Sequence, residues 1–287
     1  MTAGVHPMTG VDSLAPAEIA RLVEERGVAK ANASFLTTFV LGVLAGAFIA
    51  LGAVLSTVVS TGSTFGYGGT KLLSGVAFSL GLILVVVAGA ELFTGNNLIT
   101  MSWVSRHIPL SRLLRNWAIV YVGNLVGALS IVVMLYLADW WRQADAGVGG
   151  TALSIAAAKA SLPFTAVVFR GILANALVCL AVWLASAGRS LTDKVLAIVF
   201  PITAFVAAGF EHSIANMYFL PMGLALKGQA SVVQASGLSV GEAADFDIGA
   251  TIVNVAAATV GNVIGGAGLV GLVYWFVYLR TSRRTIP

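Results

Sequence analysis

The sequence predicts an all-α membrane protein with six membrane-spanning segments, and three observations indicate it. Hydrophobic residues make up 58% of the 287 residues and charged residues 10%, whereas a soluble domain carries about 25% charged residues. The apolar stretches are continuous rather than alternating, which indicates helices and not a β-barrel. Six stretches reach the length of about 20 residues that a bilayer span needs. The composition therefore excludes a water-soluble protein.

The N-terminal region, residues 1–32, is expected to be a cytoplasmic tail with one short amphipathic helix. Its first eleven residues read as disordered. Asp12 or Ser13 is a suitable N-cap for a helix that runs to about Arg26, with Gly27 as its C-terminal stop. The helix is either a simple start helix or a movable plug that packs on the spans. No cleavable signal peptide is apparent.

The membrane domain is expected over residues 33–280, followed by a cytoplasmic tail over 281–287. Its apolar segments are 35–60, 72–105, 116–138, 164–187, 195–226 and 248–279. The second and the fifth are too long for one straight span at about 1.5 Å per residue, and both carry polar residues midway. We therefore expect both of these helices to be broken inside the membrane.

Lysines and arginines predict the orientation of the segments. With the N-terminus inside, eleven of them lie on the inner side and four on the outer side, with Arg170 near the outer end of the fourth segment. Both termini are therefore expected in the cytoplasm. The basic residues lie at span ends rather than in one patch, so no nucleic-acid partner is predicted.

An internal repeat relates the two halves of the chain. The sequence GNLVG at residues 123–127 returns as GNVIG at residues 261–265. A Glu-x4-Asn spacing marks the second and fifth segments, as Glu91 with Asn96 and as Glu211 with Asn216. Two halves of three spans each have opposite orientations, so the repeat is inverted. In that plan the broken helices face each other near the middle of the membrane.

His212 is the histidine expected at membrane depth, where ionisable groups indicate function by default. One histidine builds neither a two-imidazole haem site nor a multi-histidine metal site, so no cofactor and no metal are predicted. The roles left are a proton donor, a selectivity group or a buried packing residue, and the broken helix favours the first two. Burial disfavours a charged imidazole whereas a nearby anion favours it, so a permeating anion would make His212 a proton donor.

The two glutamates, Glu91 and Glu211, are expected to support the helix breaks. An anion path lined by carboxylates would repel its substrate. We expect both to accept hydrogen bonds from backbone N–H groups that the breaks set free. Asn96, Asn216 and Thr94 are short polar side chains suited to the same positions, and Thr94 alternatively offers its hydroxyl to a substrate or to His212.

Other polar residues have weaker patterns. Asn124 and Asn262 lie in Gly-Asn-x-x-Gly, a pattern that lets helices approach closely. Both amides need partners within the bilayer, and Asn175 in the fourth segment joins them as a candidate pore-side donor. Lys159 is either a solvated loop charge or a cation that concentrates anions at the outer mouth.

At these residues the sequence resembles the formate/nitrite transporter family, from about residue 12 to residue 280. The strings that carry the resemblance are AGAELFTGN, GNLVGA, GILAN, GFEHSIANM and GNVIGG. The resemblance implies an aquaporin-like six-helix protomer that assembles as a homopentamer with one pore per protomer. It also implies transport of small monovalent anions of weak acids, namely formate, nitrite or hydrosulfide.

The resemblance also implies roles for particular residues. His212 matches the central pore histidine, Thr94 the threonine of the loop that breaks the second helix, and Lys159 the outer-vestibule lysine. Asn175 and Asn262 match pore-side amides. The apolar constrictions correspond to Leu82 and Phe205 with Phe78 on the outer side, and to Leu92 with Val178 on the inner side. Such rings exclude hydrated ions but pass a small acid that has become neutral.

The sequence therefore predicts a pH-sensitive channel or proton-linked transporter of the inner, cytoplasmic membrane, with formate first among its anions. The strings DSLAPAEIARLVEERGVAKA and CLAVWLASAGRSLTDK look most like formate channels, whereas Gly95-Asn96 and Arg170 look more like the nitrite and hydrosulfide branches. A neutral-solute channel of the water or glycerol type predicts paired Asn-Pro-Ala boxes, and none occurs in the sequence. A membrane enzyme would need a nucleophile–base or metal constellation, which the sequence does not contain.

Overall fold

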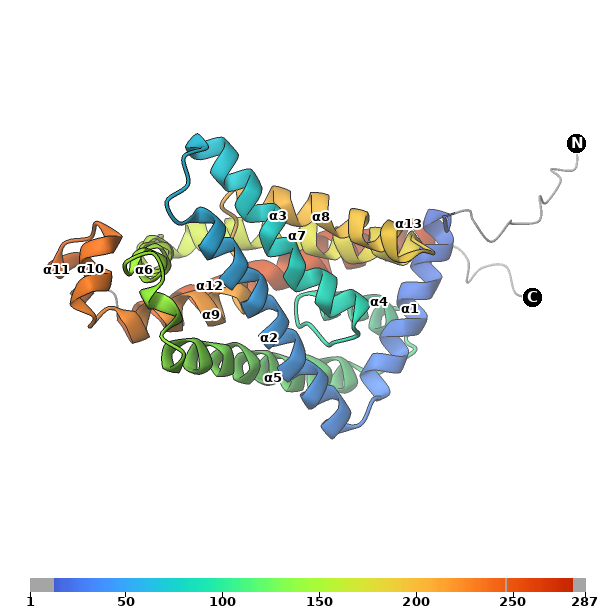
Figure 1. Ribbon diagram of the computed structural model, residues 1–287. Helices are drawn as coiled ribbons and strands as arrows, with labels where there is room; N and C mark the ends of the chain where they lie inside the picture. The colour runs from blue at the N-terminus through green and yellow to red at the C-terminus, as the bar shows by residue number, and fades with distance from the viewer. Residues whose placement is uncertain (1–12, 246, 281–287) are drawn as a thin grey trace, which may run out of the picture.

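The computed structural model describes residues 13–245 and 247–280, and all regular structure in these residues is helical. The helices form one elongated bundle (Figure 1). Among the described residues, five helices are long and apolar enough to cross a membrane. The predicted class, an all-α membrane protein, is therefore confirmed. The expected disordered start and C-terminal tail lie outside the described residues.

The helices follow one another along the chain without an intervening strand in the described residues. They are α1 (Pro16–Asn32), α2 (Phe35–Ser60), α3 (Gly66–Val87), η1 (Gly95–Ile99), α4 (Thr100–Val104), α5 (Leu110–Leu137), η2 (Trp140–Arg142), α6 (Gly147–Ala160), α7 (Phe164–Ala187), α8 (Leu191–Ala207), α9 (Ser213–Leu226), α10 (Ala230–Ser236), α11 (Val240–Asp245), α12 (Ile248–Val263), η3 (Ile264–Leu272) and α13 (Val273–Tyr278).

Local capping explains where several helices begin. The Ser34 hydroxyl accepts a hydrogen bond from the Thr37 backbone N–H at 3.1 Å and so caps α2, which has the predicted bounds. A Ser190–Asp193 capping box starts α8, and its hydrogen bonds lower the pKa of the Asp193 carboxyl. Such caps satisfy N–H groups that a helix start leaves free.

The helix α1 is longer than the sequence predicted. It runs from Pro16 to Asn32, so Gly27 lies inside it and the predicted stop at this glycine is wrong. A Cβ at Gly27 would overlap the hydroxyl of Ser102 on α4, and that hydroxyl donates to the Glu24 carbonyl at 2.7 Å. Gly27 therefore serves close packing, which the sequence pattern does not distinguish from a helix end.

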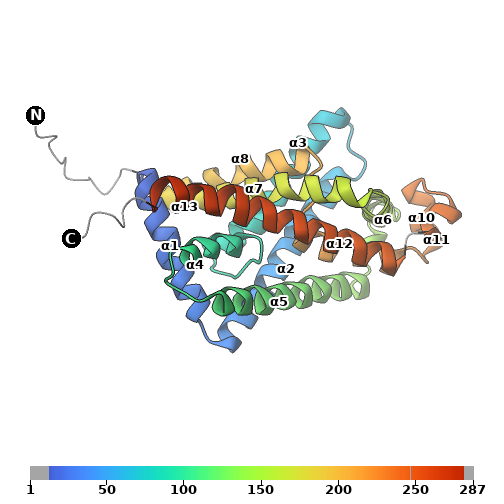
Figure 2. The ribbon, with the colours of Figure 1, turned by 180° about the vertical axis from the view of Figure 1, so that it is seen from behind.

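The repeated Gly-Asn-x-x-Gly motif brings two helix pairs into close contact. A Cβ at Gly127 of α5 would overlap the Val43 carbonyl of α2. In the same way, a Cβ at Gly265, just after α12, would overlap the Ile172 carbonyl of α7. Figure 2 shows α12 lying along α7. The glycines are therefore packing positions, as the small-xxx-small pattern predicted.

Two non-helical segments interrupt the long apolar stretches, and we name them the first break segment (residues 88–94) and the second break segment (residues 208–212). Each lies directly after a helix, α3 in the first case and α8 in the second. The second residue of each is a glycine with left-handed backbone, Gly89 with φ +83° and Gly209 with φ +69°. The two helices therefore end in the same way, because glycine adopts this conformation without strain.

The sequence did not predict α6, α10, α11 or the π-helical stretch η3. The helices α6, α10 and α11 lie together at the end of the bundle opposite α1 and α13 (Figures 1 and 2). Because α6 packs against α9, Lys159 near its C-terminal end lies on an ordered helix and not in a solvated loop. The π-helix η3 packs against α7 and η1; π-helical turns are rare and often lie near functional sites.

Candidate functional site

A hydrogen bond between Thr94 and His212 joins the last residues of the two break segments. The Thr94 hydroxyl oxygen and His212 Nε2 lie 2.9 Å apart, and the two residues are 0% and 2% exposed. His212 is also the N-cap of α9, where its Nδ1 accepts the Ala215 backbone N–H at 3.1 Å. A neutral imidazole with Nδ1 as acceptor carries its proton on Nε2, so Nε2–H donates to Thr94. The Thr94 hydroxyl proton remains for another acceptor.

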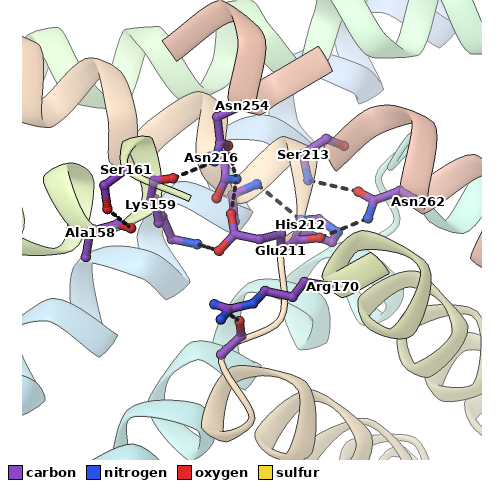
Figure 3. Close-up of polar contacts among 12 residues, drawn as sticks. Ala158, Lys159, Ser161, Arg170, Glu211, His212, Ser213, Asn216, Asn254 and Asn262 are labelled. Atoms are coloured by element: carbon purple, nitrogen blue, oxygen red, sulfur yellow. Dashed lines mark hydrogen bonds and ion pairs between the residues drawn. The ribbon is translucent and has the colours of Figure 1, made fainter. Parts of the chain in front are cut away.

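Glu211, next to His212, belongs to a closed set of four side chains that we name the Glu211 cluster (Lys159, Glu211, Asn216 and Asn254; Figure 3). One carboxylate oxygen binds Lys159 Nζ at 2.9 Å, and the other accepts from the Asn216 amide at 2.6 Å. The Asn216 amide also donates to Asn254 at 2.7 Å, and Asn254 donates to the Lys159 backbone carbonyl at 2.8 Å.

The same arrangement occurs around Glu91 in the first half of the chain, and we name it the Glu91 cluster (Lys30, Glu91, Asn96 and Asn116). Lys30 Nζ lies 3.1 Å from one carboxylate oxygen, and the Asn96 amide donates to the other at 2.6 Å. Asn96 also donates to Asn116 at 2.9 Å, and Asn116 donates to the Lys30 backbone carbonyl at 3.2 Å. Lys30 of α1 therefore corresponds to Lys159 of α6.

Asparagine amides, and not the carboxylates, satisfy the backbone groups that the breaks set free. Asn262 accepts from the Ser213 N–H at 2.8 Å and donates to the Gly171 and Glu211 carbonyls at 2.8 and 2.9 Å. Asn124 makes the matching three bonds, accepting from Phe93 N–H at 3.0 Å and donating to the Gly42 and Glu91 carbonyls at 2.7 and 2.9 Å.

The expectation that Glu91 and Glu211 bind freed backbone N–H groups is therefore wrong. Each carboxylate instead pairs with a lysine and an asparagine side chain. A buried carboxylate is costly unless a cation and hydrogen bonds compensate it. A break exposes both N–H and C=O groups, and an amide suits it because it donates and accepts, whereas a carboxylate only accepts.

Asn175 holds the first break segment to its neighbours. Its amide donates to the Thr94 carbonyl at 3.2 Å, to Asn97 at 3.1 Å and to the Asn262 carbonyl at 2.7 Å. Neither Asn175 nor Asn262 lines either of the two cavities that flank the Thr94–His212 pair. Sequence reasoning expected pore-side donors here; in the structure the donors of both amides are used inside the protein.

Two cavities reach the buried centre. The Lys159 cavity, about 370 Å³, is lined by His212 and by the charged residues Lys71, Lys159, Arg170 and Glu211. The Lys30 cavity, about 390 Å³, is lined by the charged residues Arg26, Lys30, Glu91 and Lys194. Within the described part of the chain, each cavity thus combines three cationic side chains with one carboxylate. Each cavity therefore has a net positive lining, and a net positive cleft favours anions over cations.

Apolar side chains line parts of both cavities. Phe78 and Phe205 line the Lys159 cavity and contact each other edge to face, with ring centroids 5.5 Å apart. Leu82 and Leu92 line the Lys30 cavity, so Leu82 faces the cavity opposite to the one that Phe205 lines. Val178 is buried in the core and lines neither cavity.

The residues that sequence reasoning missed are Lys30, Arg26, Lys194, Asn116 and Asn254. A signal was present for the two asparagines, because Asn116 lies eight residues before Asn124 as Asn254 lies eight before Asn262. The repeat is therefore longer than the Gly-Asn-x-x-Gly motif. Lys30 has no such signal, since its separation from Glu91 differs from that between Lys159 and Glu211.

An all-helical membrane protein with a buried polar pair between two cationic cavities has the architecture of a channel or transporter. The family model described as "Formate/nitrite transporter" matches residues 17–276. The chain belongs to this family.

Similar proteins agree with the family match. The chain is 44% identical over 277 residues to formate channel FocA of Escherichia coli (strain K12), covering 94% of this chain and 96% of that protein. It is 38% identical to a probable formate transporter of Methanothermobacter thermautotrophicus, covering 92% and 97%. A solved structure described as "Pentameric formate channel with formate bound" has a TM-score of 0.77 and 40% identity, covering 86% of this chain and 98% of its own. A second, an "FNT family ion channel", has a TM-score of 0.78 at 27% identity, covering 91% and 98%.

Proposed function

We propose that the protein is a pH-sensitive channel for small monovalent anions of weak acids, with formate as its main substrate. The observation that carries the proposal is the Thr94–His212 hydrogen bond, which lies between two cationic cavities and beside apolar side chains. The relatives described above as formate channels support formate.

The proposed architecture has six spans, of which the second and the fifth are broken at the two break segments. Both termini lie in the cytoplasm, because the inner side then carries most lysines and arginines. The Lys159 cavity is then the outer vestibule and the Lys30 cavity the inner one. The assembly is a homopentamer in the cytoplasmic membrane, by analogy with the similar pentameric formate channel.

In the proposed mechanism the positive vestibule draws the anion to His212. The charge of the anion favours uptake of a proton from the vestibule solvent at Nδ1 of the imidazole. An imidazolium has N–H groups at both nitrogens, so it loses the Ala215 cap on Nδ1, which costs about 1 kcal/mol. The imidazolium transfers its Nδ1 proton to the anion and returns to its neutral, capped form. Nε2–H keeps its hydrogen bond to the Thr94 hydroxyl throughout, which holds the ring in place. The neutral acid then passes the apolar side chains and releases its proton on the other side.

Flux through liposomes tests this function. Wild-type protein and the variants His212→Ala and His107→Ala are reconstituted, and fluxes of formate, nitrite, hydrosulfide and glycerol are measured at two pH values. His107 is the matched control, because it is half exposed and pairs with Glu24 away from both cavities. We expect formate flux to depend on pH, to change strongly in His212→Ala and to remain in His107→Ala.

Other outcomes separate the alternatives. A larger flux of nitrite or hydrosulfide than of formate would keep the family and replace the substrate. Glycerol flux without anion flux would reject the anion channel itself. Unchanged formate flux in His212→Ala would leave the channel standing and exclude proton transfer through this histidine.

A further inference from the structure

The Lys159 cavity contains a cationic side chain that no carboxylate neutralises, and it is not the lysine that sequence reasoning selected. Lys159 Nζ lies 2.9 Å from Glu211, its side chain is only 17% exposed, and it also lies 5.5 Å from the centroid of the Phe219 ring. Its charge is therefore already compensated. Arg170 and Lys71 line the same cavity, and no carboxylate of the described residues lies within 4.0 Å of either. Of the two, only Arg170 carries a planar fork of donors.

We propose that Arg170 is the group that captures the anion in this cavity, and that its guanidinium selects planar anions with two terminal oxygens over hydrosulfide. The inference rests on the proposed anion channel and names the residue that sets its substrate class. Arg170 resembles both the nitrite and the hydrosulfide branches of the family, and the chemistry of the guanidinium favours the first of these two substrates. Formate and nitrite are planar two-oxygen anions, whereas hydrosulfide presents one sulfur atom.

The backbone fixes Arg170 beside the second break segment. Its carbonyl accepts the Glu211 N–H at 3.4 Å, and its Nη1 donates to the Gly209 carbonyl at 3.4 Å. Gly209 is the residue with left-handed backbone that ends α8. Figure 3 shows the Arg170 guanidinium apart from the Lys159–Glu211 pair. The side chain is exposed toward the cavity that His212 also lines.

The chemistry of the guanidinium matches this role. It presents five N–H donors in a planar fork. In the structure the guanidinium makes one long hydrogen bond, to the Gly209 carbonyl. The free donors can form two parallel hydrogen bonds with a two-oxygen anion. An ammonium in the same place supplies charge without the fork, and hydrosulfide offers one acceptor atom and gains nothing from a second donor.

Three variants in liposomes separate the fork from its charge. Arg170→Lys keeps the charge, Arg170→Gln removes it, and Lys71→Gln removes another cation that lines the same cavity. The measured quantity is the concentration of formate, nitrite or hydrosulfide that gives half-maximal flux. We expect Arg170→Lys to raise this concentration about tenfold for formate and nitrite, because one of two charge-assisted hydrogen bonds is lost. For hydrosulfide we expect the concentration to stay within about twofold of the wild-type value, because the charge is kept.

The remaining variants complete the test. Arg170→Gln is expected to raise the half-maximal concentration of all three anions. Lys71→Gln is expected to raise it by a smaller factor, which is the same for the three anions. The proposal is overturned if Arg170→Lys leaves the half-maximal concentration of formate unchanged, or raises that of hydrosulfide by the same factor. It is also overturned if Lys71→Gln raises the values for formate and nitrite but not the value for hydrosulfide. Absence of anion flux in the wild type would instead reject the proposed function. Arg170→Lys keeps the charge and length of the side chain, so its result stands even if Arg170→Gln fails to fold.

Discussion

The Thr94 hydroxyl and the His212 imidazole lie 2.9 Å apart where the two break segments meet. Each segment contributes one of the two groups, so the bond forms only when both helix ends are in place. The Ala215 N–H occupies the other ring nitrogen, which fixes the ring and leaves Nε2 directed at Thr94. The geometry of the break segments therefore determines which nitrogen faces the proposed path.

Replacing Thr94 tests whether this hydroxyl contributes to transport. Thr94→Val keeps the shape but removes the hydrogen bond to His212, whereas Thr94→Ser keeps the hydroxyl. We expect formate flux in liposomes to fall about 100-fold in the valine variant, the scale of positioned proton transfer, and to stay within about threefold in the serine variant. Equal flux in the two variants would show that the hydroxyl is dispensable.

The buried Glu211–Lys159 pair provides a second prediction. The side chains are 3% and 17% exposed, so removing one partner leaves the other buried and uncompensated. Glu211→Gln or Lys159→Met is expected to destabilise the protein by about 3–5 kcal/mol, and the double variant by less than the sum of the two. Thermal unfolding in detergent at constant pH measures this coupling. Strict additivity would contradict it.

The Glu91–Lys30 pair is the matched comparison. Its side chains are more exposed, at 13% and 36%, so water screens the charges better. We therefore expect Lys30→Met to cost roughly 1 kcal/mol or less in the same assay. A larger loss of stability in Lys30→Met than in Lys159→Met would show that solvent exposure does not determine how much each pair contributes to stability.

Sequence patterns predicted those parts of the structure that repeat or that depend on length. Excess length with polar residues midway predicted an interruption in the second and the fifth segments, where the structure has the two break segments. Apolar length predicted α2 and α7 with their observed bounds. Gly27 shows what such patterns do not distinguish. Glycine suits the end of a helix and also a close contact such as that with Ser102, so its presence alone does not predict where α1 ends.

The partners of the site residues depend on tertiary contacts. Lys30 and Glu91 are far apart in the sequence, and the packing of α1 against η1, which directly follows the first break segment, brings them together. The sequence assigned the freed backbone N–H groups to the carboxylates, whereas asparagine amides bind them in the structure. This error has the same cause, because each carboxylate pairs with a lysine that only the fold brings close. Which cation of the Lys159 cavity pairs with Glu211 is likewise a tertiary contact: Lys159 does and Arg170 does not.

Asn262 is expected to be essential for the second break segment. Asn262→Leu removes one acceptor and two donors at once, leaving the Ser213 N–H and the Glu211 carbonyl without this partner, whereas the Gly171 carbonyl lies within the helix α7. Each costs about 1–3 kcal/mol, so we expect loss of a folded protein or a large fall in its thermal stability. Asn32→Leu is the control, because Asn32 donates to one exposed backbone carbonyl within α1.

Gly46 links helix packing to the first break segment. A Cβ at this position would overlap the backbone of Asn124, and the Asn124 side chain holds the Glu91 carbonyl and the Phe93 N–H. Gly46→Ala is therefore expected to lower the free energy of unfolding by about 1–3 kcal/mol and to reduce formate flux, because α5 must shift together with Asn124. Gly68→Ala is the matched control: it lies in α3 with no atom within 4 Å of an added Cβ, so helix propensity predicts a gain of roughly 0.5–1 kcal/mol. If both variants keep wild-type stability and flux, close packing at Gly46 does not position the break segment.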